Sequence, residues 1–254
     1  MKILNVCILF FFVLFVSMVK ADETNPKPFV IPELKEWKSD KGTFQSNESG
    51  KIVYPEGNTQ LQKVANLFAE DYQTMFGKTL QVTTEKASAG DFVFSVSKDK
   101  KLGKEGKEAY QIKISDMVTI SAPEAIGTFW ATRTLLQMLE QNETLQLPKG
   151  QISDYPDYAL RGFMLDCGRK FIPMHFLRDY VKVMAYYKMN AFQIHLNDNG
   201  FPQFFENSWD KTYAAFRLES ETYPELTAQD GSYTKKEFVE LQKLAEEYFV
   251  EIIP

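Results

Sequence analysis

Apolar positions in the first part of the chain follow the periods of short strands and a helix. Residues 51–55 and 80–84 have strand character, and residues 59–77 between them repeat apolar residues at helical spacing. The apolar face of this predicted helix consists of Leu61, Val64, Leu67, Phe68, Tyr72 and Met75. Gly77 then marks the end of the helix, because glycine readily adopts the left-handed conformation found there.

A third strand, a hairpin and a second helix come next. Residues 91–97 have strand character, and residues 110–122 alternate apolar and polar positions around Asp116, which predicts a hairpin. A helix is predicted over 123–141, with the buried stripe Phe129, Thr132, Leu135, Leu136 and Leu139. Trp130 fits core packing better than a ligand platform. These elements indicate an α+β domain over 33–153, which ends in the Pro- and Gly-containing stretch 147–158.

After residue 158 the pattern of apolar positions predicts strands that alternate with helices. The predicted order is a strand at 159–168, a helix at 173–190, a strand at 191–197, a helix at 234–248 and a strand at 249–254. Thr234 and Glu237 form a capping box at the start of the last helix. The βαβαβ order predicts an incomplete parallel sheet over 158–254, part of a barrel or of a doubly wound fold. One glycine follows the first strand, so the nucleotide-binding fingerprint of doubly wound folds is missing.

Composition narrows the class of protein. Of the 254 residues, 44% are hydrophobic and 25% are charged, which is typical of a globular protein. The net charge of −5 provides no basic footprint, so we expect no nucleic-acid partner. The aromatic content of 14% suits either a large core or a surface that stacks on ring-shaped ligands.

The first residues resemble a signal for export. Lys2 precedes an apolar run at 8–19, and Val19, Lys20 and Ala21 fit a signal-peptidase site, so we expect cleavage of residues 1–21. The mature protein would be periplasmic or secreted and not bound to a membrane, with a linker over 22–32. Cys167 would be its single cysteine, which excludes an internal disulfide. No zinc-type spacing is present, and we expect neither a metal nor a cofactor.

Polar residues follow the two strands where ligands bind in parallel α/β folds. Asp166 and Arg169 follow the first strand, and His195, Asp198 and Asn199 lie at the end of the second. Carboxylates and an arginine fork together suit a ligand rich in hydroxyl groups. Asp166 could equally cap its own loop or pair with Arg169, and His195 could be a structural residue of the interior.

The segment between the second strand and the last helix, residues 198–233, is long for a compact domain and favours a lid or a binding loop. Its aromatic residues could stack on sugar rings or pack the loop onto the domain. These rings are Phe201, Phe204, Phe205, Trp209, Tyr213 and Phe216.

Residues 161–200, "RGFMLDCGRKFIPMHFLRDYVKVMAYYKMNAFQIHLNDNG", resemble the start of the catalytic barrel of family-20 glycoside hydrolases, the β-N-acetylhexosaminidases. Residues 125–139 and 152–162 resemble the end of that family's N-terminal α+β domain. The resemblance implies an α+β domain followed by the start of a TIM-type α/β barrel. It also implies a glycan partner with a terminal N-acetylhexosamine.

The resemblance also implies roles for individual residues. Arg169 matches the arginine that holds hydroxyls of the terminal sugar, and Asp198 matches the first residue of an acidic pair that orders the site. Asn199 replaces the second residue of that pair, and Asp166 and His195 have supporting positions. Residues 199–205, "NGFPQFF", differ from the sequence that usually follows in this family. This difference affects the expected substrate preference within the family and not the family itself.

Members of this family use substrate-assisted hydrolysis, in which the sugar's own 2-acetamido group attacks the anomeric carbon. The resemblance implies that the catalytic Asp-Glu pair lies beyond Pro254, so this chain contains no catalytic residue and is expected to be inactive alone. Two alternatives stay open: a non-catalytic carbohydrate-binding remnant, or another retaining glycosidase with a similar N-terminal domain. The order K-M-N followed by H-L-N-D favours the hexosaminidases over the other glycosidases.

Overall fold

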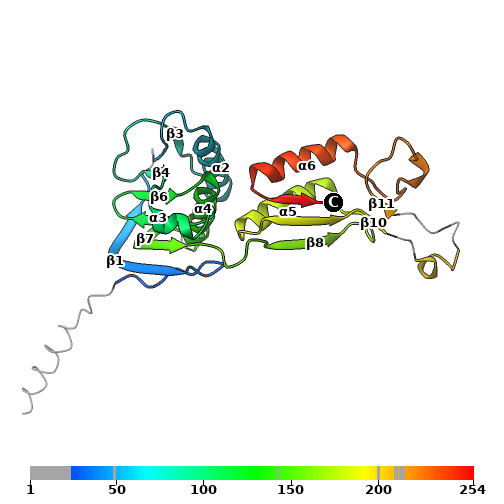
Figure 1. The fold of residues 1–254 in the computed structure, drawn as a ribbon, viewed down its shortest axis with the longest axis horizontal. Coiled ribbons are helices and arrows are strands. Elements are labelled where there is room, and N and C mark those ends of the chain that lie inside the picture. Colours follow the sequence, from blue (N-terminus) through cyan, green and yellow to red (C-terminus); the bar gives the residue numbers. More distant parts are fainter. Residues whose placement is uncertain (1–23, 48–49, 142, 199–200, 209–210, 212–214) are drawn as a thin grey trace, which may run out of the picture.

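The computed structural model describes residues 24–47, 50–141, 143–198, 201–208, 211 and 215–254 (Figure 1). The strands are β1 (Glu36–Gln45), β2 (Lys51–Val53), β3 (Gln81–Thr83), β4 (Phe92–Val96), β5 (Tyr110–Ile114), β6 (Val118–Ala122), β7 (Gln146–Asp154), β8 (Gly162–Asp166), β9 (Ala191–His195), β10 (Asn197–Asp198), β11 (Ala215–Phe216) and β12 (Glu251–Ile253). The helices are α2 (Thr59–Phe76), α3 (Lys100–Lys104), α4 (Ala125–Glu140), α5 (Met174–Tyr186) and α6 (Lys235–Glu247), with short 3-10 turns η1 (Pro202–Phe204) and η3 (Pro224–Leu226). Within the described ranges, no helix has both the length and the apolar character that crossing a membrane requires.

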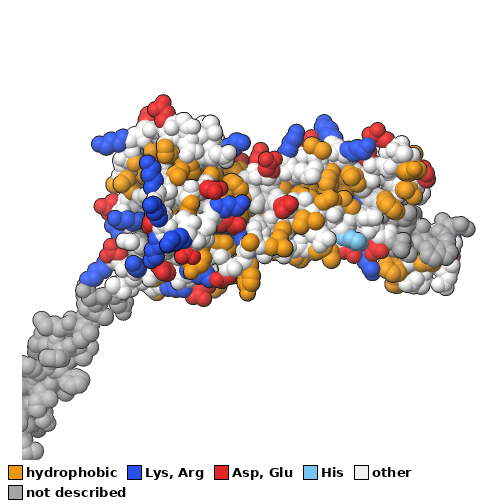
Figure 2. All heavy atoms as spheres, in the orientation of Figure 1, with side chains coloured by type: hydrophobic (Ala, Val, Ile, Leu, Met, Phe, Trp, Pro, Cys, Tyr) orange, Lys and Arg blue, Asp and Glu red, His pale blue; other side chains and the backbone are white. Residues whose placement is uncertain are grey.

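The N-terminal unit is a seven-stranded mixed sheet in the order β1-β7-β5-β6-β4-β2-β3. Its helices α2 and α4 lie on the same side of the sheet (Figure 1). Phe68 of α2 is fully buried, and its ring lies 5.3 Å from the ring of Phe92 on β4. Charged side chains of both signs are scattered over the visible face of this unit, among hydrophobic and uncharged groups (Figure 2). The unit therefore has an apolar sheet face under helices and a second face that is largely free of them.

Local signals in the sequence place several elements correctly. Helix α2 begins where the Asn58 side chain accepts a hydrogen bond from the Leu61 amide, and it ends at Gly77, whose φ is 67°. Strands β5 and β6 pair as the antiparallel hairpin that the alternation predicts. The predicted capping box of Thr234 and Glu237 is present at the start of α6. Each of these features depends on residues close together in the chain.

The sequence interpretation missed two strands, β1 and β7, and treated a packed segment as a linker. β1 and β7 pair with each other across about 100 residues of sequence, and β7 occupies most of the stretch interpreted as a boundary. Residues 25–32, interpreted as a linker, lie against this sheet. The Asn25 side chain donates hydrogen bonds to the carbonyls of Asp40 and Gly42, both at 2.7 Å, and Val30 is buried. This segment therefore packs on the surface of the N-terminal unit and contributes Val30 to its core.

The second unit is a three-stranded parallel sheet in the order β12-β9-β8, connected through α5 and α6. The ring of Tyr180 on α5 stacks on Phe163 and Phe192, with centroids 5.6 and 5.9 Å apart. Phe192 and Ile194 are buried, whereas Gln193 between them is exposed. The sheet thus has one face covered by helices and one face that carries Asp166 and His195 at its carboxyl end.

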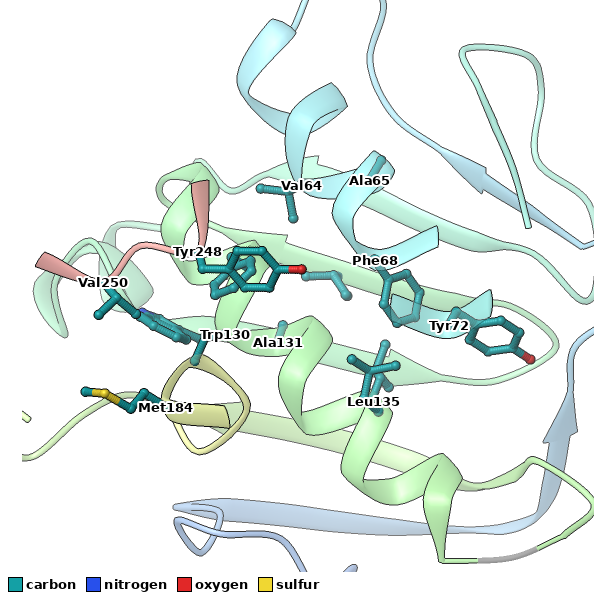
Figure 3. Packing of buried hydrophobic residues seen from close by; sticks show 14 of the residues in the cluster. Val64, Ala65, Phe68, Tyr72, Trp130, Ala131, Leu135, Met184, Tyr248 and Val250 are labelled. Carbon is teal, nitrogen blue, oxygen red and sulfur yellow. The ribbon is translucent and has the colours of Figure 1, made fainter. Parts of the chain in front are cut away.

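Helix α4 lies between the two units. Every residue from Gly127 to Leu139 is buried, not only the predicted stripe, because α2, the segment around Ile31 and the second unit cover the helix faces that the sheet leaves free. Figure 3 shows Trp130 of α4 beside Val250, Tyr248 and Met184 of the second unit. This placement confirms Trp130 as a core residue.

Candidate functional site

The carboxyl ends of β8 and β9 bring the predicted polar residues together. Asp166 and His195 are direct partners in the register of the two parallel strands. The amides of Cys167 and Gly168 then donate hydrogen bonds to the His195 carbonyl, at 3.0 and 2.9 Å. A side chain at Gly168 would lie 3.1 Å from the Asp198 Cβ, so glycine suits this close approach. The turn therefore directs Arg169 toward the end of β9.

Arg169 joins the two carboxylates of this site. Its Nε lies 3.1 Å from Asp198 Oδ2 and 3.1 Å from Asp166 Oδ2. The Arg169 amide also donates to Asp166 Oδ1 at 3.0 Å, so Asp166 both caps the turn and fixes the guanidinium. The Arg169 side chain is 56% exposed, and its two terminal nitrogens have no partner among the described residues. The far end of the fork is thus free to donate hydrogen bonds to a ligand.

His195 completes the cluster from β9. Its Nε2 lies 3.8 Å from Asp198 Oδ2, and its side chain is partly exposed, not enclosed in the interior. Ligand atoms of Asp166, His195 and Asp198 lie within 4.8 Å of one another, so these three residues could hold a cation. The guanidinium of Arg169 already supplies positive charge to both carboxylates. Asn199, the remaining predicted site residue, lies outside the described residues.

Aromatic rings from the following loop reach the same site. The Phe201 ring centroid lies 4.5 Å from Cζ of Arg169, a stacking contact between ring and guanidinium. Phe204 lies 6.1 Å from Phe201 and is largely exposed. Trp209 and Tyr213 lie outside the described residues. Of the described rings, Phe201 is therefore the one that contacts Arg169.

Arg217 is a buried residue of this region that the sequence interpretation missed. The Arg217 side chain is 2% exposed, and its Nε donates to the Cys167 carbonyl at 2.6 Å. Its terminal nitrogens bond to the carbonyls of Gly168 and Gly231 and to the carboxylate of Asp230. Arg217 thereby connects the long loop to the turn that carries Arg169. Its position between the apolar residues Phe216 and Leu218 is the only signal in the sequence.

Tyr233 fixes the same loop at its far end. Its hydroxyl donates to the Ile172 carbonyl at 2.6 Å, and its amide donates to the Arg217 carbonyl at 2.6 Å. Burial raises the pKa of Tyr233 and also that of the Cys167 thiol beside it. The end of the loop is therefore a packed part of the fold, and Cys167 is a neutral core residue.

Two family models match the chain on either side of the end of β7. The model "Glycosyl hydrolase family 20, domain 2" matches residues 27–155, and "Glycosyl hydrolase family 20, catalytic domain" matches residues 158–254. The chain belongs to glycosyl hydrolase family 20. The resemblance seen in residues 161–200 is thus confirmed, and in this family 20 chain the site residues lie in the part that matches the catalytic domain.

Two curated relatives of this family 20 chain are beta-hexosaminidases from bacteria. The protein from Porphyromonas gingivalis is 26% identical over 216 residues, which are 77% of this chain and 26% of the relative. The protein from Akkermansia muciniphila is 32% identical over 130 residues, or 50% of this chain and 26% of the relative. The chain thus spans about a quarter of the length of these relatives.

Solved structures share the fold. The family 20 β-N-acetylhexosaminidase from Streptomyces coelicolor matches with a TM-score of 0.75 and 24% identity, over 91% of this chain and 47% of that chain. An exo β-N-acetylglucosaminidase from Vibrio harveyi, in complex with N-acetylglucosamine, matches with a TM-score of 0.72 and 23% identity, over 92% of this chain and 38% of that chain. The arrangement of the α+β sheet and the parallel unit is therefore that of family 20 structures.

Proposed function

We propose that this chain supplies part of the sugar-binding site of a β-N-acetylhexosaminidase, which removes terminal N-acetylhexosamine from glycans. The observation that carries the proposal is the Arg169 fork, held through Nε by Asp166 and Asp198 with its terminal nitrogens free and exposed. A planar fork with a fixed base can donate to two neighbouring hydroxyl groups of one sugar. Membership of family 20 supplies the class of substrate.

In this proposal Asp198 orients Arg169 and helps to neutralise it, and Phe201 covers one face of the guanidinium. Asp166 and His195 support the cluster from the ends of β8 and β9. We further propose that β8, β9 and β12 are the first strands of a barrel, because parallel strands that are consecutive along the chain are also neighbours in the sheet.

The chemistry that the resemblance implies needs two further carboxyl groups. One orients the 2-acetamido group of the sugar while it attacks the anomeric carbon, and the other donates and then accepts a proton. We assign neither role to a residue of this chain. The 254 residues alone are accordingly proposed to bind the terminal sugar without hydrolysing it.

The substrate class is tested on a chimeric polypeptide in which residues 158–254 of this chain replace the corresponding start of a complete family 20 catalytic domain. Aryl β-N-acetylglucosaminides should be hydrolysed much faster than aryl β-glucosides, because only the former carry the participating acetamide. Equal turnover of the glucoside would overturn the assignment. Binding of N-acetylglucosamine without any turnover would instead favour a non-catalytic carbohydrate-binding protein.

The role of Arg169 is tested in the same polypeptide by Arg169→Lys, which keeps the charge but removes the planar fork. We expect kcat/KM to fall about 30-fold, or roughly 2 kcal/mol of transition-state stabilisation. Arg178→Lys is the matched control, because Arg178 forms an exposed ion pair with Glu240 far from the strand ends. An unchanged kcat/KM in Arg169→Lys would assign Arg169 to a structural ion pair.

We also propose that the protein is exported, on the basis of Lys2, the apolar run at 8–19 and the site at Val19, Lys20 and Ala21. N-terminal sequencing of the protein from cells is the test. A mature chain that begins at Asp22 is expected, and a chain that retains Met1 in the cytoplasmic fraction would contradict the proposal.

A further inference from the structure

The outer face of the seven-stranded sheet is polar and only partly covered. In β5, in β6 and in β7 from Gly150 onward, buried residues alternate with partly or fully exposed ones. Ile112 and Ile152, for example, face the helices and are buried. The residues beside them therefore point to the opposite face, which α2 and α4 do not cover.

The register of the strands aligns these outward residues into two rows across β1, β7, β5 and β6. The first row is Glu36, Ser153, Gln111 and Ser121. The second row is Lys38, Gln151, Lys113 and Thr119. Neighbouring strands are about 4.8 Å apart, so each row spans about 14 Å. We name these eight residues the polar sheet face.

The polar sheet face lines a cavity. Its volume is about 310 Å³, and Lys101 and Leu102 of α3 form a wall beside the rows together with Glu105, which follows the helix. Tyr155, which follows β7, contributes an aromatic ring to the lining. Figure 2 shows Lys and Arg side chains gathered over the part of the N-terminal unit that holds α3, β6 and β7. The face is therefore hollowed, and it is bordered by both polar and aromatic groups.

None of the eight side chains of the polar sheet face has a hydrogen bond or ion pair within the described part of the chain. The donors and acceptors of the polar sheet face are thus available to a ligand. The two rows contain two amides, three hydroxyls, two ammonium groups and a carboxylate, and these groups provide both hydrogen-bond donors and hydrogen-bond acceptors.

We propose that the polar sheet face binds a hydroxyl-rich oligosaccharide chain that lies across the strands. Each sugar hydroxyl both donates and accepts a hydrogen bond, which matches amide and hydroxyl side chains in neighbouring strands. Five of the eight side chains of the face are neutral amides or hydroxyls, and the lining carries only one more lysine than glutamate, so its hydrogen-bonding groups suit a hydroxyl-rich chain better than a polyanion such as nucleic acid. The face is a second glycan site, remote from Arg169, and it does not depend on the proposed catalytic function.

The test is an NMR titration of the isotopically labelled chain with chitohexaose, with cellohexaose in parallel. We expect amide shifts in β1, β5, β6 and β7. The triple variant Gln111→Ala, Lys113→Ala, Gln151→Ala should weaken this binding at least tenfold. A matched triple variant on the opposite side of the sheet, Gln62→Ala, Lys63→Ala, Gln73→Ala in α2, changes the same residue types and should leave it unchanged. Thermal unfolding of both variants checks that the fold is intact.

The variant Arg169→Ala separates the two sites, because shifts at the sheet should persist when binding near Arg169 is lost. Three results would overturn the inference: no shift at the sheet with either oligosaccharide, full binding by the Gln111, Lys113 and Gln151 triple variant, or binding of single-stranded DNA in preference to both oligosaccharides. A negative result in the hexosaminidase assay would not change the interpretation of this titration, because the two experiments test different sites.

Discussion

Replacing Lys188 by methionine tests the buried polar contact that joins the two units. Lys188 follows α5 in the second unit and is 6% exposed. Its Nζ donates to the Tyr110 hydroxyl at 2.7 Å and lies 3.1 Å from Asp154 Oδ2, both in the N-terminal sheet. Burial lowers the pKa of Lys188, and the carboxylate of Asp154 opposes that shift. Lys188→Met keeps an unbranched side chain and removes only the charge and its hydrogen bonds.

The expected loss in the free energy of unfolding follows from the contacts that Asp154 keeps in the variant. Asp154 stays buried with the Tyr110 hydroxyl and the Lys35 amide as its hydrogen-bond donors, but without a cation. Removal of one partner from a buried ion pair costs roughly 3–5 kcal/mol, because the other charge is left uncompensated. This is a large part of the roughly 5–15 kcal/mol that stabilises a typical domain. Adding Asp154→Asn should recover part of the loss, because it removes the unpaired charge.

The assay is urea unfolding of residues 22–254, followed by circular dichroism and tryptophan fluorescence. Lys243→Met is the matched control, since Lys243 is exposed on α6 and should change stability by less than about 0.5 kcal/mol. A loss below about 1 kcal/mol in Lys188→Met, or no recovery in the double variant, would refute the reasoning that Lys188 compensates a buried carboxylate.

Two further predictions concern other buried groups. Arg217→Met should speed amide hydrogen exchange at Cys167 and Gly168, because the carbonyls of these residues lose the Arg217 donors. Arg178→Met, at an exposed arginine, should leave this exchange unchanged. Equal protection in both variants would contradict the role of Arg217. Burial raises the pKa of Tyr110 well above 10, and that of Tyr248 is raised as well. An unfolded tyrosine loses its proton near pH 10, so the unfolded state binds fewer protons above that pH and stability should fall as pH rises further. The phenolate absorbance contributed by Tyr110 and Tyr248 should therefore appear only when the protein unfolds. Ionisation of either residue in the intact fold would disprove the burial argument.

Periodicity and capping residues in the sequence were sufficient for α2, the hairpin β5–β6 and the start of α6. In each case the signal lies within a few residues, because helix faces, turns and caps are made by near neighbours in the chain. The cluster of Asp166, Arg169, His195 and Asp198 was also predictable. Parallel strands place their carboxyl ends at one edge, and the residues that follow them must meet there.

Pairing between distant segments was decided only by the tertiary structure. β1 has a single buried residue, Phe44, and therefore little apolar alternation, and β7 contains Pro148 and Gly150, so neither shows a strand pattern of its own. The burial of Lys188 and Arg217 was equally unpredictable. A charged side chain can be buried only where partners and a cover exist, and here these come from residues 34 and 50 positions away in the sequence.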